Sequence, residues 1–167
     1  MILTTHAVIG AAAASMVPEH PVLAFGVAFA SHFAFDAIPH WHYPVASIIK
    51  DKKNPMNNDM VVGKHFIADV AVIGFDALLG IGISLAAFAY FLHVPYLLIL
   101  IGALGGILPD PLQFVYWKFR RQPVKSLQRL HRLVHAKTDL DNRPLSGVTS
   151  QVCLILAAIS VTALAMG

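Results

Sequence analysis

Charged side chains are scarce in this sequence. Only 13% of its 167 residues are Asp, Glu, Lys or Arg, whereas 57% are hydrophobic and the mean hydropathy is +0.67. This composition argues against a water-soluble core and places the chain in the membrane class. Cysteine is nearly absent as well, because Cys153 is the only one, so neither an intramolecular disulfide nor a thiolate metal cluster can form. Any bound metal would be held by nitrogen and oxygen atoms.

Several common functional motifs are also missing. The sequence has no Gly-rich phosphate loop, no Gly-x-Ser-x-Gly elbow and no credible serine triad. Its net charge of +3 is modest, and no aromatic residues interleave with the basic ones to make a nucleic-acid platform. We therefore expect no nucleic-acid partner. No repeat or composition change divides the chain, so we expect a single membrane domain over residues 1–167.

Long hydrophobic runs, by contrast, are abundant. Judged against the ~20 residues needed to cross a bilayer, they predict an all-α, polytopic membrane helix bundle with about five transmembrane helices. The spans are expected at residues 3–17, 21–38, 65–92, 95–117 and 145–166. A basic segment at residues 124–137 has an amphipathic pattern and is expected to be a helix lying in the membrane interface.

The positive charges are confined to two parts of the chain. All twelve Lys and Arg residues fall in the polar segments 40–64 and 118–144. With five spans, both segments lie on the same side, and the positive-inside rule places that side in the cytosol. The sequence therefore predicts a multi-pass protein of a bacterial or archaeal cell membrane, with its N-terminus cytosolic and its C-terminus outside.

Histidine and aspartate stand out against the apolar background, and on this topology most of them meet at the cytosolic face. Three pairs have the i, i+4 spacing that points two side chains the same way along a helix. Neutral imidazole and carboxylate suit Zn²⁺, with Mn²⁺ or Mg²⁺ as alternatives, and one or two ions would lower the pKa of bound water to roughly 7. The predicted ligands, the three pairs and two further residues, are His32, Asp36, His65, Asp69, His131, His135, His6 and Asp110.

Each of these residues also has a structural interpretation. A lone histidine on an apolar helix is commonly interfacial, and Asp36 is close enough to Pro39 to bond backbone groups that the proline frees. The basic helix needs no chemistry to bind anionic headgroups. Asp76 lies about 16 Å further along its helix than His65, too deep for a ligand, so we expect it to bond a Ser or Thr of the helix at residues 145–166 or to support the site. The sequence leaves the roles of His40 and His42 open.

Three short motifs resemble a known family. "GVAFASHFAFDAIPHW" resembles the Ser-His-x3-Asp helix of the LexA-regulated, membrane-bound metal-dependent hydrolases of bacteria, "GGILPD" their Leu-Pro-Asp motif and "HRLVHAK" their His-Arg-x-x-His-Ser motif. The motif order differs, since the Ser-His-x3-Asp element comes first here. The His-x3-Asp spacing is also similar to helices of zinc-dependent phospholipase C and S1-type nucleases, which favours phosphoesters. The family resemblance implies five ligands: His32, Asp36, Asp110, His131 and His135.

Together these features predict a metal-dependent hydrolase of a phospholipid or isoprenoid phosphate at the inner leaflet. We expect Arg129 and Arg132 to neutralise phosphate charge and Asp69 to accept a proton from the attacking water. Two alternatives stay open: a divalent-metal or proton-coupled transporter, and a non-enzymatic module that binds lipid or a partner. The sequence does not decide the oligomeric state, although a homodimer would supply more walls for a polar site than five helices do.

Overall fold

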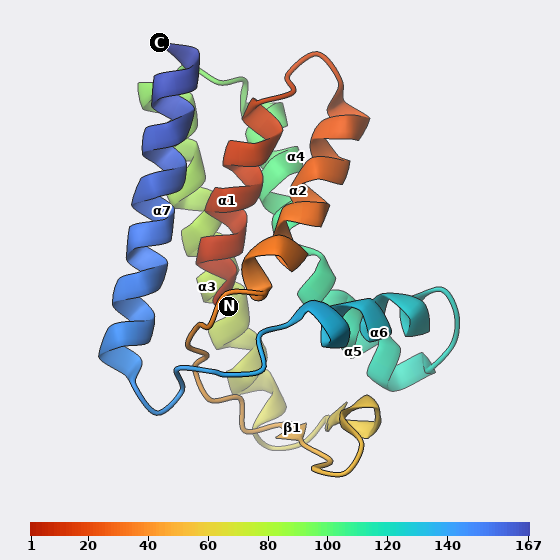
Figure 1. The fold of residues 1–167 in the computed structure, drawn as a ribbon. Coiled ribbons are helices and arrows are strands. Elements are labelled where there is room, and N and C mark those ends of the chain that lie inside the picture. The colour runs from red at the N-terminus through yellow and green to blue at the C-terminus, as the bar shows by residue number, and fades with distance from the viewer.

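The computed structural model describes all 167 residues, and nearly all of its regular structure is helical (Figure 1). A π-helical turn, Leu85–Phe91, continues α3, and the loop before α3 contains a 3-10 turn, Pro55–Asn57. In the same loop β1 (Ile48–Ile49) pairs antiparallel with β2 (Asp59–Met60). The all-α prediction is confirmed. The seven α-helices are α1 (Leu3–Ser15), α2 (Pro21–Asp36), α3 (Phe66–Ser84), α4 (Tyr96–Ile107), α5 (Pro109–Phe119), α6 (Val124–Val134) and α7 (Pro144–Met166).

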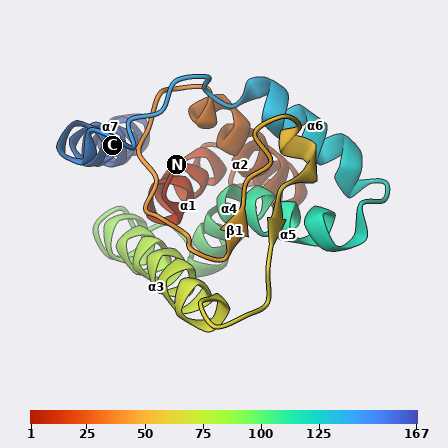
Figure 2. The ribbon, with the colours of Figure 1, turned by 90° about the horizontal axis from the view of Figure 1, so that it is seen from below.

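Helix α1 is the centre of the bundle. It contacts α2, α3, α4 and α7, and the end-on view shows these helices around it (Figure 2). Small residues permit this packing: a Cβ added at Gly106 of α4 would collide with the His6 carbonyl oxygen, and one added at Gly102 would lie 2.6 Å from the Gly10 carbonyl oxygen. The backbones of α1 and α4 therefore touch, which brings His6 against the end of α4.

Fewer helices are long enough to cross a membrane than the sequence predicts. Two qualify by length and hydropathy, Phe66–Phe91 and Pro144–Met166. A third qualifies if α4 and α5 count as one broken span, but they are bent by 45°. The prediction of five spans is therefore wrong. With 13 and 16 residues, α1 and α2 are only about 20 and 24 Å long, against a hydrocarbon core of about 30 Å.

Proline explains why the span predicted at residues 95–117 is not one helix. Pro109 has no N–H and cannot continue the hydrogen-bond ladder of α4, whereas the first turn of a new helix tolerates it. Pro109 accordingly begins α5, and Asp110 follows it in the first turn. The helix predicted at residues 124–137 is also shorter, since α6 ends at Val134 and His135 lies beyond its last turn.

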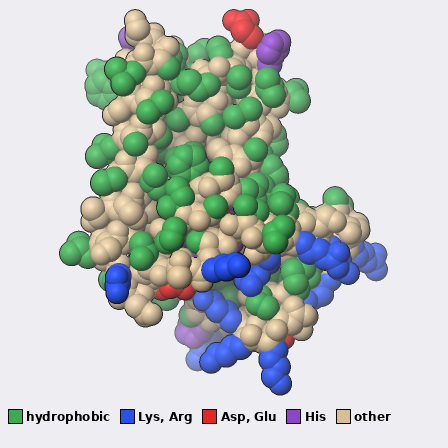
Figure 3. Space-filling model, in the orientation of Figure 1, with side chains coloured by type: hydrophobic (Ala, Val, Ile, Leu, Met, Phe, Trp, Pro, Cys, Tyr) green, Lys and Arg blue, Asp and Glu red, His purple; other side chains and the backbone are tan.

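The surface of the bundle is apolar along its length and basic at one end. Large side chains of α3 and α7 are exposed, such as Ile67 (79%), Phe75 (69%) and Leu164 (84%). Exposed apolar surface on this scale is typical of a protein that contacts lipid. Lys and Arg gather at the end that carries α5, α6 and the β1–β2 loop, as the space-filling view shows (Figure 3).

A buried carboxylate fixes the start of α1. Asp76 of α3 accepts hydrogen bonds from the backbone N–H groups of Leu3 (2.7 Å) and Thr4 (3.1 Å). The Thr4 hydroxyl donates to the same carboxylate at 2.6 Å. The first N–H groups of a helix have no partner within it, so Asp76 supplies a cap from another helix. Asp76 therefore bonds a hydroxyl of α1 and not one of the C-terminal helix, and its structural role is to hold α1 in place.

Candidate metal centre

Asp36, the last residue of α2, lies in the middle of a buried polar group. Its Oδ2 is 2.9 Å from His131 Nε2 and 3.2 Å from His32 Nε2. Its Oδ1 is 3.1 Å from His6 Nε2 and 3.7 Å from His40 Nε2. The Asp36 side chain is 1% exposed, so these imidazoles, together with the amino group of the first residue 3.1 Å from Oδ1, take the place of water around it.

A second carboxylate completes a set of four donors. Asp110 Oδ1 is 3.6 Å from His32 Nε2 and 3.9 Å from His131 Nε2. Two atoms each about 2.1 Å from one ion at a tetrahedral angle lie about 3.4 Å apart. The nitrogen–oxygen distances here, from 2.9 to 3.9 Å, lie on both sides of that value. The residues His32, Asp36, Asp110 and His131 are therefore spaced as ligands of one metal ion.

The hydrogen bonds of His32 also suit a metal ligand. Its Nδ1 is 2.8 Å from the Gly106 carbonyl oxygen, which accepts an N–H and so places the ring proton on Nδ1. In a neutral ring with this tautomer, the Nε2 lone pair points at the carboxylates of Asp36 and Asp110. This nitrogen is buried and has no hydrogen-bond partner. A cation would be attracted to all three groups, and two carboxylates with two neutral imidazoles balance the charge of a divalent ion.

The orientation of α6 differs from that of a helix lying freely on a membrane. Its buried residues are Gln128 and His131, whereas Leu130 (46%) and Leu133 (81%) are exposed. The Gln128 side chain donates to Gln113 Oε1 of α5 at 3.1 Å. The face of α6 that carries Gln128 and His131 is therefore docked onto the protein and delivers His131 to the site, while Leu130 and Leu133 face outward.

Not all of the predicted ligands join this group. Asp69 instead accepts a hydrogen bond from the backbone N–H of Ser47 at 2.6 Å, which fixes the loop before β1. His65 is exposed just before α3 begins. Arg129 and Arg132 are exposed on α6, away from its buried face. The structure thus leaves the pair His65 and Asp69 outside the four-residue group.

His135 belongs to a second histidine group together with His40 and His42. The i, i+4 pair His131/His135 does not grip one ion, because α6 ends before His135 and its ring joins the other two. Burial lowers the pKa of His40 to about 3, and it lowers the pKa of His42 and of His135 below the ordinary value. All three are therefore neutral at pH 7. Sequence reasoning left His40 and His42 without a role, although His40 follows Asp36 by four residues.

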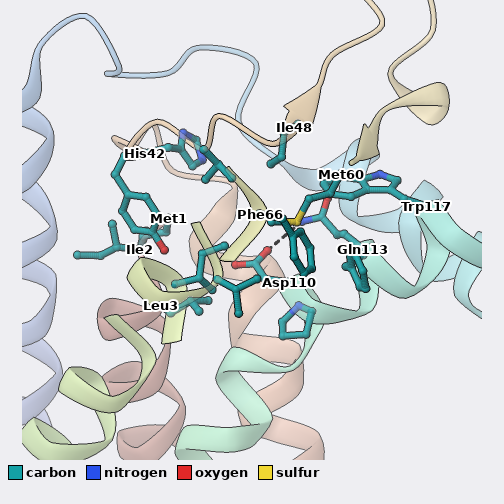
Figure 4. A pocket seen from close by; sticks show the side chains of 16 residues that line it. Met1, Ile2, Leu3, His42, Ile48, Met60, Phe66, Asp110, Gln113 and Trp117 are labelled. Carbon is teal, nitrogen blue, oxygen red and sulfur yellow. Dashed lines mark hydrogen bonds between the residues drawn. The ribbon is translucent and has the colours of Figure 1, made fainter. Parts of the chain in front are cut away.

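An apolar cavity of about 460 Å³ borders the four-residue group. Twelve of its sixteen lining residues are hydrophobic, and the lining comes from the start of α1, the segment between α2 and β1, the strands β1 and β2, α3 and α5. Asp110 and His42 lie on its wall, as the close view shows (Figure 4). The dashed bond in that view joins Asp110 Oδ1 to Gln113 Nε2, which donates at 2.9 Å. One candidate metal ligand, Asp110, thus faces a space suited to an apolar molecule.

Comparison with known proteins gives no relative for this chain. No family model, curated protein or solved structure matches it. The three motifs that resemble the membrane-bound hydrolases therefore remain an expectation from the sequence.

Proposed function

We propose that this protein is a metal-dependent hydrolase of the bacterial or archaeal cell membrane that cleaves a lipid phosphoester. The observation that carries the proposal is the set of two imidazoles and two carboxylates, one of which, Asp110, lies on the wall of an apolar cavity. Ionisable groups in an apolar protein are costly and typically functional. The family resemblance and the His-x3-Asp spacing support the same reaction.

His32, Asp36 and His131 would hold the ion, with Zn²⁺ as the expected metal, and Asp110 would lie next to the fourth position, which is left for water. A divalent ion there supplies water activation and neutralises phosphate charge. The protein contributes orientation: the Gly106 carbonyl oxygen fixes the His32 ring, and Gln113 holds the Asp110 carboxylate. These contacts keep the donors in place before a substrate arrives.

Asp110 is the best placed proton acceptor. Its carboxylate both lines the cavity and lies among the donors, so it contacts a head group that enters from the cavity. Asp69, the acceptor expected from the sequence, is not among the cavity residues and is held by Ser47. A group within hydrogen-bond reach of the reacting water is required for proton transfer. We therefore assign that role to Asp110.

The size and lining of the cavity favour a lipid as the substrate. Its volume lies within the range of small-molecule sites, about 300 to 1,000 Å³, and its apolar lining suits an acyl or isoprenoid chain. It lies at the basic end of the bundle, where Lys and Arg attract anionic headgroups. The positive-inside rule puts this end in the cytosol, so the substrate would enter from the inner leaflet. Exposed Arg129 and Arg132 would then bind surrounding headgroups instead of the reacting phosphate.

The test is phosphate release by the detergent-solubilised protein, stripped with a chelator and reloaded with Zn²⁺, Mn²⁺ or Mg²⁺. The substrates are phosphatidic acid and an isoprenoid diphosphate. Wild type should release phosphate, and His131→Ala and Asp110→Asn should each lower the rate at least about 100-fold. His20→Ala, at the opposite end of the bundle, should leave the rate unchanged. No hydrolysis by any metal-loaded form, or equal rates in all variants, would overturn the proposal.

A further inference from the structure

Three histidines form a second polar group next to Asp36. His40 and His42 lie in the segment after α2, and His135 lies directly after α6. One ring nitrogen of each lies within 4.8 Å of one from each of the others. Their ring centroids are 4.5 to 5.5 Å apart. None of these three residues belongs to the set of four described above.

Every Nδ1 atom in this group faces an oxygen that accepts a hydrogen bond. A neutral imidazole carries one N–H, and an acceptor at Nδ1 places the proton there. The Nε2 atoms are then left with lone pairs and no proton. Histidine ligands of metals show this same pattern, with the second nitrogen bonded to a carbonyl or carboxylate. The three bonds are His40 Nδ1 to the Ile38 carbonyl at 2.6 Å, His42 Nδ1 to Asp141 Oδ1 at 3.0 Å and His135 Nδ1 to the Ala136 carbonyl at 3.1 Å.

The arrangement of His40 and His42 also favours a bound cation. Their Nε2 atoms are 2.9 Å apart. With both protons on Nδ1, no hydrogen lies between these nitrogens, and their lone pairs repel each other. His40 is 1% exposed, so solvent does not screen the contact on its side. An ion bound by both nitrogens would replace this repulsion with two favourable bonds after only a small separation of the rings.

We infer that His40, His42 and His135 bind a second divalent metal ion, with Zn²⁺ as the expected occupant. Imidazole suits zinc and related transition metals, whereas Mg²⁺ and Ca²⁺ require oxygen ligands. Three protein ligands leave a fourth position open. The inference goes beyond the proposed function, since it concerns a separate set of ligands and stands whether or not the protein hydrolyses a lipid.

Asp141 positions one ligand of this site. Its Oδ1 accepts both the backbone N–H of His42 at 2.9 Å and the ring Nδ1–H at 3.0 Å. These two bonds fix the His42 ring relative to its own backbone. Carboxylates that orient a histidine in this way typically increase metal affinity by about 10- to 100-fold. Asp141 is therefore a positioning residue.

The experiment compares zinc content among matched double variants of the full chain. Protein stripped with a chelator is reloaded with Zn²⁺, freed of excess metal and measured by elemental analysis. Wild type should hold two ions per chain. His42→Ala/His135→Ala should hold one, and His32→Ala/His131→Ala should also hold one. The control His20→Ala/His65→Ala removes two exposed histidines and should hold two.

The outcomes separate the two metal sites. Two ions in the His42→Ala/His135→Ala protein would overturn this inference. One ion in wild type, lost only with His32 and His131, would also overturn it and leave the proposed function intact. One ion lost only with His42 and His135 would support the inference and remove the metal site of the proposed function.

A milder variant covers the case in which the double variant fails to fold. Asp141→Asn keeps an oxygen acceptor near His42 but removes its charge. We expect its second zinc ion to bind about 10- to 100-fold more weakly in competition with a chelating dye, with the first ion unaffected. Glu19→Gln at the far end of the bundle is the control. Equal affinities in all three proteins would count against the site.

Discussion

Asp36 Oδ2 lies 2.9 Å from His131 Nε2, although 95 residues separate the two along the chain. One residue ends α2 and the other belongs to the buried face of α6. This contact makes α6 part of the protein interior at its polar face, so the site cannot form until the helix has docked. A helix attracted only by anionic headgroups would not need such a partner.

The cavity should determine the length of chain that the enzyme accepts. Val70 of α3 lines it, and replacement by Trp fills part of its volume. We expect Val70→Trp to raise KM for long-chain phosphatidic acid several-fold and to affect a short-chain analogue much less. Val72→Trp is the matched control, because Val72 is on the same helix, is 53% exposed and does not line the cavity. Equal effects of the two variants on both substrates would contradict this role of the cavity.

The close approach of α1 and α4 should make Gly106 sensitive to one added methyl group. A Cβ there meets the His6 carbonyl oxygen and the Gly10 backbone, neither of which can move as a side chain can. Gly106→Ala should lower stability by about 1 to 3 kcal/mol, seen as a lower thermal unfolding midpoint in detergent.

Gly82 provides the comparison, since nothing lies within 4 Å of a Cβ built there. Gly82→Ala should be neutral or stabilising by up to about 1 kcal/mol, because alanine loses less backbone entropy in a helix. Equal midpoints for the Gly106 and Gly82 variants would show that the helices are less tightly packed than described.

Asp76 should contribute to stability and not to metal binding. Asp76→Ala leaves the N–H groups of Leu3 and Thr4 without partners, at about 1 to 3 kcal/mol for each buried group. Thermal unfolding in detergent should therefore begin at a lower temperature, and Asp139→Ala, at an exposed position, should not change it. An unchanged unfolding midpoint for Asp76→Ala would contradict the capping role.

The β1–β2 loop should lose one of its anchors in acid. Lys118 Nζ donates to Asp59 Oδ1 at 2.7 Å and holds the pKa of that carboxyl below its usual range. A carboxyl whose pKa is lowered by folding stabilises the fold above its unfolded pKa, and this contribution is lost as the pH falls through its folded pKa.

Lys118→Met should therefore destabilise the protein at pH 7 by less than about 1 kcal/mol, since the pair is exposed. The difference from wild type should shrink as the pH falls below about 4, and it should also shrink in concentrated salt. Unfolding midpoints measured at pH 7 and pH 3 check this. A difference that stays constant with pH would show that the side-chain stem, and not the charge pair, stabilises the loop.

The features that follow from helical periodicity and charge could be predicted from the sequence. The all-α class, the basic end and the partnership of His32 with Asp36 depend on composition or on spacing within one helix. Asp36 and His32 have their predicted separation because α2 continues unbroken to Asp36. Asp110 lies close to His32 and Asp36 because successive helices run in alternating directions.

The features that the sequence does not predict depend on where helices end and on contacts between distant segments. His135 was paired with His131 by spacing, but α6 stops one residue too early. His40 and His42 lie in an irregular segment, where no period indicates which way a ring points. The bond from Ser47 to Asp69 is likewise a loop contact that no local pattern specifies.

The central claim is that a metal ion is bound around Asp36, and it is tested most directly by comparing two buried carboxylates. Asp36 and Asp76 are 1% and 8% exposed, and both accept several hydrogen bonds, but only Asp36 lies among histidines. The measurement is the zinc content of Asp36→Ala and Asp76→Ala, loaded and analysed identically. We predict that Asp36→Ala loses the ion of the four-residue group, whereas Asp76→Ala keeps the wild-type content despite its lower stability. Wild-type zinc content in Asp36→Ala would contradict the account.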